Sequence, residues 1–182
     1  MIKSKLSLTS PPTLLNQKFL VLLLVITFMG WACQEPKDEE EIKKQIEEFY
    51  LLPQDIYSET PNSNILSSEL VRRIETAKEV TAKDRKRIQE SDHPTDKPLL
   101  LEGCVFSSLY DGFHTFHIKE IAIENDTAKA VINLEYASDP SEKWSDLLIL
   151  VNEGGWKVDN VIFAPSHTGD RDLWQRLDLT RF

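Results

Sequence analysis

Residues 143–164, KWSDLLILVNEGGWKVDNVIFA, decide the fold that we expect for this chain. They predict two strands joined by the turn Asn152-Glu153-Gly154-Gly155, because glycine supplies the positive φ angles that a hairpin turn requires. The first strand is apolar on both faces, with Leu147, Ile149 and Val151 on one face and Trp144, Leu148 and Leu150 on the other. In the second strand, Trp156, Val158 and Ile162 alternate with Lys157, Asp159, Val161 and Phe163. Because a strand with two apolar faces is normally covered on both, we expect the hairpin in the middle of a sheet.

The first 33 residues differ in composition from the rest of the chain. They contain Lys3, Lys5 and Lys18 but no acidic residue, and an apolar run occupies residues 19–32. This run of about 14 residues is shorter than the ~20 that a membrane-spanning helix needs. A basic segment, a short apolar segment and a small residue at its end are typical of a secretory signal peptide. We therefore expect residues 1–32 to be a signal peptide, with a single membrane-spanning anchor as the alternative.

Cys33 follows Ala32 at the end of the apolar run, which resembles the lipobox of bacterial lipoproteins, although Gly30 stands where that motif usually has an aliphatic residue. The resemblance implies that Cys33 carries the lipid and holds the chain in the outer membrane, on its periplasmic or surface-exposed face. The acidic residues up to Glu40 resemble the flexible tether of surface-exported lipoproteins of the Bacteroidetes type. Alternatively, they form the first turn of the next helix, where carboxylates favour the helix dipole.

The charge and the cysteines of the chain exclude some classes of function. The full chain has 21 basic and 30 acidic residues, a net charge of −9, and removal of the three signal-peptide lysines leaves 18 against 30, or −12. This charge argues against nucleic-acid binding, which depends on neutralised phosphates. Lipidation of Cys33 would leave Cys104 without a partner for a disulfide, and we expect Cys104 to be a small buried residue.

Helical periodicity marks three further segments. Apolar residues at positions 42, 46, 49 and 50 predict a helix over residues 38–52 that ends before Pro53. A second helix is expected to begin with Ser67 as N-cap, and Thr81 lies either in a kink of this helix or at the cap of another. One helical turn is expected over residues 105–110, and a tail helix around residues 173–177 with Asp170 as its cap.

Two more strands are expected over residues 113–124 and 127–137, joined by the tight turn Asn125-Asp126. Helices followed by hairpin-linked strands indicate an α+β fold, in which N-terminal helices pack on one face of a curved antiparallel sheet of about four strands.

Several short pieces of the chain carry a family resemblance: Asp96-Lys97-Pro98, residues 105–110 (VFSSLY), Trp144-Ser145-Asp146 and residues 156–161 (WKVDNV). They are similar to a family of bacterial lipoproteins within the nuclear transport factor 2-like (cystatin-like) superfamily. The resemblance covers about residues 40–164. It implies a cone-shaped domain over residues 41–182, after a lipidated cysteine and acidic tether at residues 33–40. The resemblance implies no particular reaction, because that family has no established activity.

The cone implied by the resemblance can hold a small apolar ligand, and five residues are candidates for its pocket: Tyr50, Tyr110, Trp144, Asp146 and Trp156. Asp146 lies two residues from Trp144 on the same face of a strand. A carboxylate beside an indole in an apolar site can have a raised pKa and act as a general base. Ketosteroid isomerase-like members of the superfamily combine such a base with a tyrosine and a protonated acid. The alternative is that Asp146 pairs with a basic residue or caps a loop.

We expect the other polar candidates to have structural roles. His114 and His117 point to opposite faces of a strand and share no metal-ligand cluster, so no metal or cofactor is expected. The basic cluster over residues 83–87 indicates a solvated helix face more than a binding patch. Asp96 and Lys97 are expected to form a pair that fixes their loop. Neither a phosphate-binding glycine loop nor a nucleophile elbow occurs in the sequence.

Three functions remain as hypotheses. The first is a lipid-anchored binding or interaction domain outside the cytoplasm, without catalytic activity. The second is a small ketosteroid isomerase-like enzyme that uses Asp146 in an apolar pocket. The third is an immunity or inhibitor protein for a secreted toxin, because an acidic surface suits a basic partner.

Overall fold

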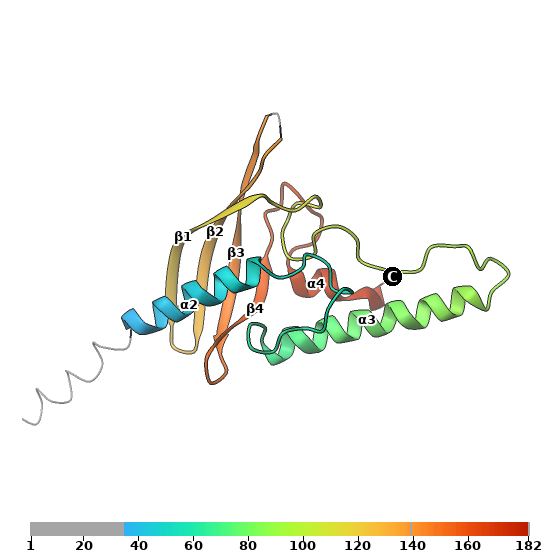
Figure 1. Ribbon diagram of the computed structural model, residues 1–182, viewed down its shortest axis with the longest axis horizontal. Coiled ribbons are helices and arrows are strands. Elements are labelled where there is room, and N and C mark those ends of the chain that lie inside the picture. Colours follow the sequence, from blue (N-terminus) through green and yellow to red (C-terminus); the bar gives the residue numbers. More distant parts are fainter. Residues whose placement is uncertain (1–34, 139, 182) are drawn as a thin grey trace, which may run out of the picture. The chain divides into compact units, whose positions relative to one another are not determined.

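The computed structural model describes residues 35–138 and 140–181, and residues Glu39–Phe182 form one compact unit (Figure 1). The fold is α+β, as predicted. The elements in order are α2 (Glu35–Tyr50), α3 (Ser68–Gln89), β1 (Thr115–Glu124), β2 (Thr127–Tyr136), β3 (Glu142–Asn152), β4 (Trp156–Ile162), α4 (Leu173–Leu177) and the 3-10 helix η1 (Leu179–Arg181). The expected signal peptide and Cys33 lie outside the described residues. Within the described ranges, no helix is both long enough and apolar enough to span a membrane.

The four strands form one antiparallel sheet in the order β1-β2-β3-β4, so β3 is an inner strand and β4 lies at the edge. The expectation that the whole β3–β4 hairpin sits mid-sheet is therefore wrong. The free side of β4 is bonded by the segment that precedes α3: Val158 N–H donates to the Ile65 carbonyl, and Ser67 N–H donates to the Val158 carbonyl, both at 2.8 Å. This short parallel bridge bonds the edge at Val158 without another strand.

A bulge in β4 changes which of its side chains face the core. Leu150 pairs with Val158 but Ile149 pairs with Asn160, so Asp159 is the extra residue. Because one inserted residue reverses the alternation beyond it, Val161 joins Val158 in the core, and Ile162 lies opposite Leu147 on the outer face. The alternation expected for this strand is correct up to Val158 and wrong after it.

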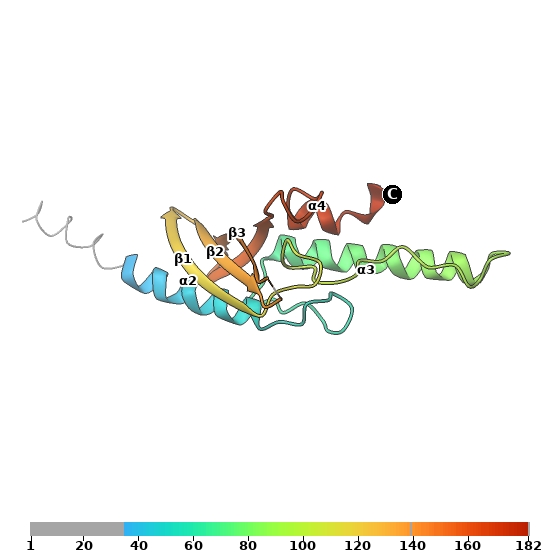
Figure 2. The same cartoon turned by 90° about the horizontal axis from the view of Figure 1, so that it is seen from above.

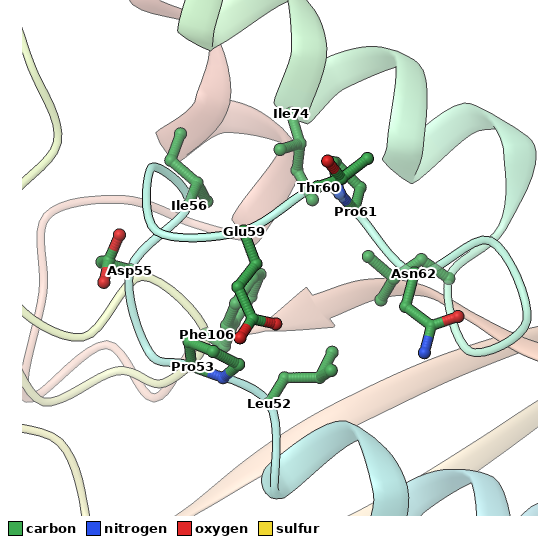
Figure 3. A pocket seen from close by; sticks show the side chains of 11 residues that line it. Leu52, Pro53, Asp55, Ile56, Glu59, Thr60, Pro61, Asn62, Ile74 and Phe106 are labelled. Carbon is green, nitrogen blue, oxygen red and sulfur yellow. The ribbon is translucent and has the colours of Figure 1, made fainter.

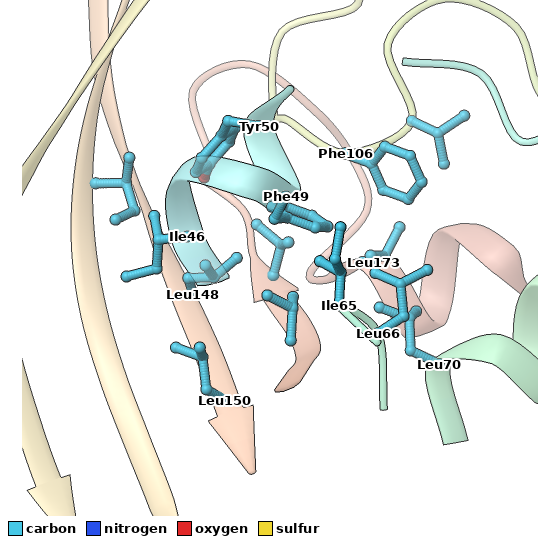
Figure 4. Close-up of a cluster of buried hydrophobic side chains, with 14 of the residues drawn as sticks. Ile46, Phe49, Tyr50, Ile65, Leu66, Leu70, Phe106, Leu148, Leu150 and Leu173 are labelled. Atoms are coloured by element: carbon cyan, nitrogen blue, oxygen red, sulfur yellow. The ribbon is translucent and has the colours of Figure 1, made fainter. Parts of the chain in front are cut away.

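The core lies between α2 and one face of the sheet, as both views of the ribbon indicate (Figures 1 and 2). The predicted helix is confirmed, and it begins at Glu35, so the acidic run belongs to α2. Ile46 of α2 lies beside Leu148 of β3, and Phe49 contacts Phe106 with their ring centroids 5.3 Å apart (Figure 4). Full burial of each such side chain contributes about 1.5–3 kcal/mol.

The second predicted helix is a single helix, α3, and Ser67 is its N-cap, whose hydroxyl accepts a hydrogen bond from Leu70 N–H at 3.0 Å. Thr81 does not interrupt it. The Thr81 hydroxyl is buried within the helix and lies 3.0 Å from the Tyr57 hydroxyl. The basic cluster near its end forms exposed ion pairs along the helix, such as Arg87 with Asp84.

Two local predictions near the C-terminal half are wrong. Residues 105–110 form no helical turn, because side chains from distant segments bind their backbone groups in place of bonds within a turn. The cap of α4 is Asp172, whose carboxylate accepts from Gln175 N–H at 2.8 Å. Asp170 instead forms ion pairs with Arg176 and Arg181.

Candidate functional site

Asp146 is buried on β3, with 1% of its surface exposed. One carboxylate oxygen, Oδ2, accepts from the Ser108 N–H at 2.9 Å and from the Trp144 indole N–H at 3.4 Å. The other, Oδ1, accepts from the Ser108 hydroxyl and from the Ala164 N–H at 3.1 Å. Both oxygens are thus occupied by donors from the surrounding loops and β3. This geometry supports the loop-capping alternative: the carboxylate holds two loops against the sheet.

Arg176 of α4 fixes the same loop from its other side. Its guanidinium donates to the carbonyls of Cys104, Val105 and Ser107 at 3.2, 2.9 and 2.6 Å, and it lies 3.9 Å from the centre of the Phe163 ring. Burial lowers the pKa of Arg176, although the partner carboxylate of Asp170 opposes this effect. Residues 104–108 are therefore held by the buried carboxylate of Asp146 and the largely buried guanidinium of Arg176. Backbone carbonyls and N–H groups bound in this way have a structural role.

Tyr50 lies in the core and not at the edge of a cavity. Its ring stacks on Phe116 at 4.9 Å and meets Phe113 edge-on at 5.1 Å. Burial raises the pKa of Tyr50 well above its ordinary value, and the nearby Asp146 carboxylate adds a smaller effect in the same direction. Its buried hydroxyl has no hydrogen-bond partner among the residues that the structure describes. Tyr50 therefore stays protonated.

The other aromatic candidates are separated from one another. Trp156 is buried, and its backbone N–H donates to the Glu41 carboxylate at 3.1 Å, which ties β4 to α2. Tyr110 lies in the loop before β1 and is 59% exposed. The structure therefore places Tyr50, Asp146 and Trp156 in the core and leaves Tyr110 on the surface.

Trp144 lines a pocket of about 410 Å³ at the end of the sheet, which we call the sheet-end pocket. Its walls are Thr115, Phe116, His117, Asn133, Leu134, Glu135, Lys143, Trp144 and Ser145. Polar groups on these walls bind each other: Lys143 pairs with Glu135 at 3.2 Å, and the Ser145 hydroxyl donates to the side-chain amide oxygen of Asn133 at 2.8 Å. These mutual bonds leave few polar groups free to orient a ligand.

A second pocket, of about 260 Å³, lies under the loop between α2 and α3 (Figure 3), and we call it the loop pocket. Its apolar walls are Leu52, Pro53, Ile56, Pro61, Leu66, Ile74 and Phe106, and its polar walls are Asp55, Glu59, Thr60 and Asn62. The walls come from the loop itself, from the start and first turns of α3 and from the segment held by Asp146 and Arg176. None of the five residues proposed from the sequence lines it.

The loop over this pocket is held in place along its length. Val105 N–H donates to the Gln54 carbonyl at 2.9 Å, and the Lys78 ammonium donates to the Glu59 carbonyl at 2.7 Å. Between them, the Tyr57 hydroxyl accepts from Leu101 N–H at 3.0 Å and contacts Thr81. A pocket whose walls are fixed before a ligand arrives loses less entropy on binding.

Two carboxylates carry the charge of the loop pocket. Burial is the largest single effect on Asp55 and opposes its ionisation, but the hydrogen bonds from Tyr57 and Ser58, whose N–H groups lie at 2.7 and 2.8 Å, together outweigh it and lower the pKa of Asp55. Asp55 is therefore ionised at neutral pH. The carboxylate of Glu59 has no ion-pair or hydrogen-bond partner within the described ranges. Its charge is available to a ligand.

The remaining polar candidates form isolated contacts. The His114 ring accepts from Ala137 N–H at 3.0 Å, and His167 lies 3.1 Å from the Glu142 carboxylate. In the part of the chain that the structure describes, no group of three or more His, Cys, Asp or Glu side chains is arranged to hold a metal ion. Lys97 pairs with Glu102 at 2.5 Å and not with Asp96. Cys104 is buried, as expected, and burial raises the pKa of its thiol.

Sequence reasoning missed the loop pocket because it treated residues 54–64 only as a connection. The one signal in the sequence was the presence of apolar residues such as Ile56 inside a polar loop.

No protein-family model, curated protein or solved structure matches this chain closely enough to assign it to a family.

Proposed function

We propose that this chain is a binding protein of the cell envelope, anchored through a lipid on Cys33, whose folded domain takes a small ligand in the loop pocket. The loop pocket carries this proposal, because it combines an apolar floor with a carboxylate that has no partner in the described part of the chain. Ligand sites are usually concave, mostly apolar and equipped with a few polar groups that orient the ligand.

The role of Asp146 supports binding over isomerase-like catalysis. A general base needs a carboxylate oxygen within reach of the substrate proton. Donors from Ser108, Ala164 and Trp144 occupy both Asp146 oxygens, and the residue lines neither the loop pocket nor the sheet-end pocket. A ligand in the loop pocket would meet no assembled pair of acid and base.

We also propose a cellular location and a fold family for this chain. The signal-like residues 1–32 and the lipobox-like Cys33 support export and lipidation. One helix across a four-stranded antiparallel sheet, with the strands in sequential order, supports the cone-shaped nuclear transport factor 2-like domain that the sequence resembles.

Native mass spectrometry of the protein, purified gently from the envelope, tests the binding function. We expect an additional mass of roughly 100–250 Da, since the pocket is slightly smaller than those that hold drug-sized ligands. Thr60→Trp should abolish this mass by blocking the pocket, because Thr60 is an exposed wall residue. Ser63→Trp is the matched control, since Ser63 is exposed on the same loop but does not line the pocket.

Retention of the ligand by the Thr60→Trp variant would refute the loop pocket as the site. A bare chain would refute ligand binding in the isolated state. Purification together with a basic protein would instead favour the inhibitor function that the acidic charge left open.

Metabolic labelling with an alkyne-bearing palmitate tests the anchor. We expect the label on the wild-type chain and on Cys104→Ala, because Cys104 is buried in the domain. Cys33→Ala should carry none. Equal labelling of both variants would contradict lipidation at Cys33.

A further inference from the structure

We infer that the loop pocket selects a small organic cation, with an ammonium-type group at Glu59 and an apolar body on the pocket floor; this inference rests on the binding function proposed above.

The mouth of the pocket is negative. Glu59 and Asp55 lie four residues apart on the loop, and both line the pocket. Figure 3 shows Glu59 and Phe106 among the side chains that line the pocket. An ammonium group bound there would meet the carboxylate and lie near an aromatic ring, whose π face also attracts cations. An anionic ligand would instead meet the like charge of the Glu59 carboxylate.

The floor is apolar. Ile56, Leu66 and Phe106 are buried, and Ile74 of α3 closes the far side. These side chains provide no hydrogen-bonding groups, so the part of the ligand that contacts them gains most if it is hydrocarbon. The amide of Asn62 at the rim adds one neutral polar group.

Lys78 lies beside this loop, but its ammonium forms no ion pair with the Glu59 carboxylate in the described part of the chain. Its ammonium donates to the backbone carbonyl of Glu59 at 2.7 Å, where it holds the loop. Its charge also favours the ionised form of Asp55, although less than the loop N–H groups do. Glu59 is therefore the carboxylate that an external cation would neutralise.

Competitive photolabelling of the full chain in lipid nanodiscs tests this inference. The probe is a benzylamine that carries a trifluoromethyl diazirine, and trypsin releases the pocket loop in one peptide, residues 45–72. The competitors are 2-phenylethylamine, 2-phenylethanol and phenylacetate, which differ mainly in charge. Empty nanodiscs give the background. Glu59→Gln is compared with Glu120→Gln, which removes the same charge from the exposed outer face of β1.

We expect the label in residues 45–72, and displacement by the amine at concentrations about three- to tenfold lower than by the alcohol, with no displacement by the carboxylate. Glu59→Gln should reduce the advantage of the amine by about two- to fivefold, the range of a solvent-accessible ion pair, whereas Glu120→Gln should not change it. Raising the salt concentration should weaken binding of the amine more than that of the alcohol.

Equal competition by the alcohol and the amine, or an unchanged ratio in Glu59→Gln, would overturn the inference and leave the binding function standing. Absence of specific label in residues 45–72, with no competition by any of the three compounds, would overturn both.

Discussion

Replacement of Asp146 by leucine should strongly destabilise the domain, whereas replacement by asparagine should cost much less. Leucine has a similar size but no acceptor, so it leaves the buried N–H of Ser108 without its partner at 2.9 Å. An orphaned buried donor costs about 1–3 kcal/mol, and a hydrogen bond to a charged group contributes about 1.5–3 kcal/mol. Since the Ser108 hydroxyl also loses its acceptor, we expect a total loss of about 3–5 kcal/mol.

Asparagine retains one acceptor oxygen. With that oxygen directed at the Ser108 N–H, its amide can donate to the Ser108 hydroxyl, which rotates to accept. The Ala164 N–H also keeps a partner, because it already donates to the Ser108 hydroxyl at 2.7 Å. The remaining losses are the charge assistance of these bonds and the acceptor of the Ser108 hydroxyl proton, together about 1–3 kcal/mol.

Urea unfolding followed by circular dichroism measures both variants, with Glu120→Leu as a surface control that should change the free energy of unfolding by less than about 0.5 kcal/mol. A loss below about 1 kcal/mol for Asp146→Leu would refute the structural role of this carboxylate. Equal losses for leucine and asparagine would refute the hydrogen-bond geometry from which the difference was derived.

Two further predictions concern buried polar groups. Tyr50→Phe should leave the free energy of unfolding unchanged or raise it by up to about 1 kcal/mol, because the Tyr50 hydroxyl is desolvated without a partner in the described chain. Tyr57→Phe should instead lower the free energy of unfolding by about 1–3 kcal/mol, because the Leu101 N–H loses its acceptor. The same urea assay measures both, and a Tyr50→Phe variant that loses as much as Tyr57→Phe would contradict this. Burial raises the pKa of Asp159 in the folded state above its pKa in the unfolded chain, so ionised Asp159 lowers the free energy of unfolding at neutral pH. This destabilisation decreases as the pH falls through the folded-state pKa, because the carboxylate becomes protonated. Asp159→Asn should therefore stabilise the domain at pH 7 by an amount that shrinks in acid, and a gain that grows in acid would show that the sign is wrong.

Local patterns in the sequence were sufficient to predict most of the secondary structure. Ser67 was identified as a cap because Leu66 and Val71 stand at the staple positions around it, and its side chain accepts from the Leu70 N–H, a contact within three residues. The turn at Asn125 was identified for the same kind of reason, and Asn125 has a φ of 56°, which asparagine tolerates better than most residues. Such contacts depend on residues close in sequence.

The failures arose where distant residues decide the local conformation. Residues 105–110 have a helical apolar pattern, but Asp146 and Arg176 bind their backbone from positions about 40 and 70 residues away. The bulge at Asp159 adds one residue to β4, which alternation alone does not reveal.

The candidate site was missed for the same reason. Its floor combines Leu52, Leu66, Ile74 and Phe106, which come from four separate parts of the chain. The residues chosen from the sequence were aromatic or acidic side chains on regular elements. Most of these are buried in the core, as large apolar side chains usually are.

A crystal structure of the protein isolated from its own envelope, with its ligand retained, would show whether the loop pocket is the binding site. We expect electron density in the loop pocket, with an apolar part on Phe106 and Ile74 and a polar end within hydrogen-bond distance of the Glu59 carboxylate. A ligand bound elsewhere, or a loop collapsed into the pocket so that no ligand fits, would contradict it.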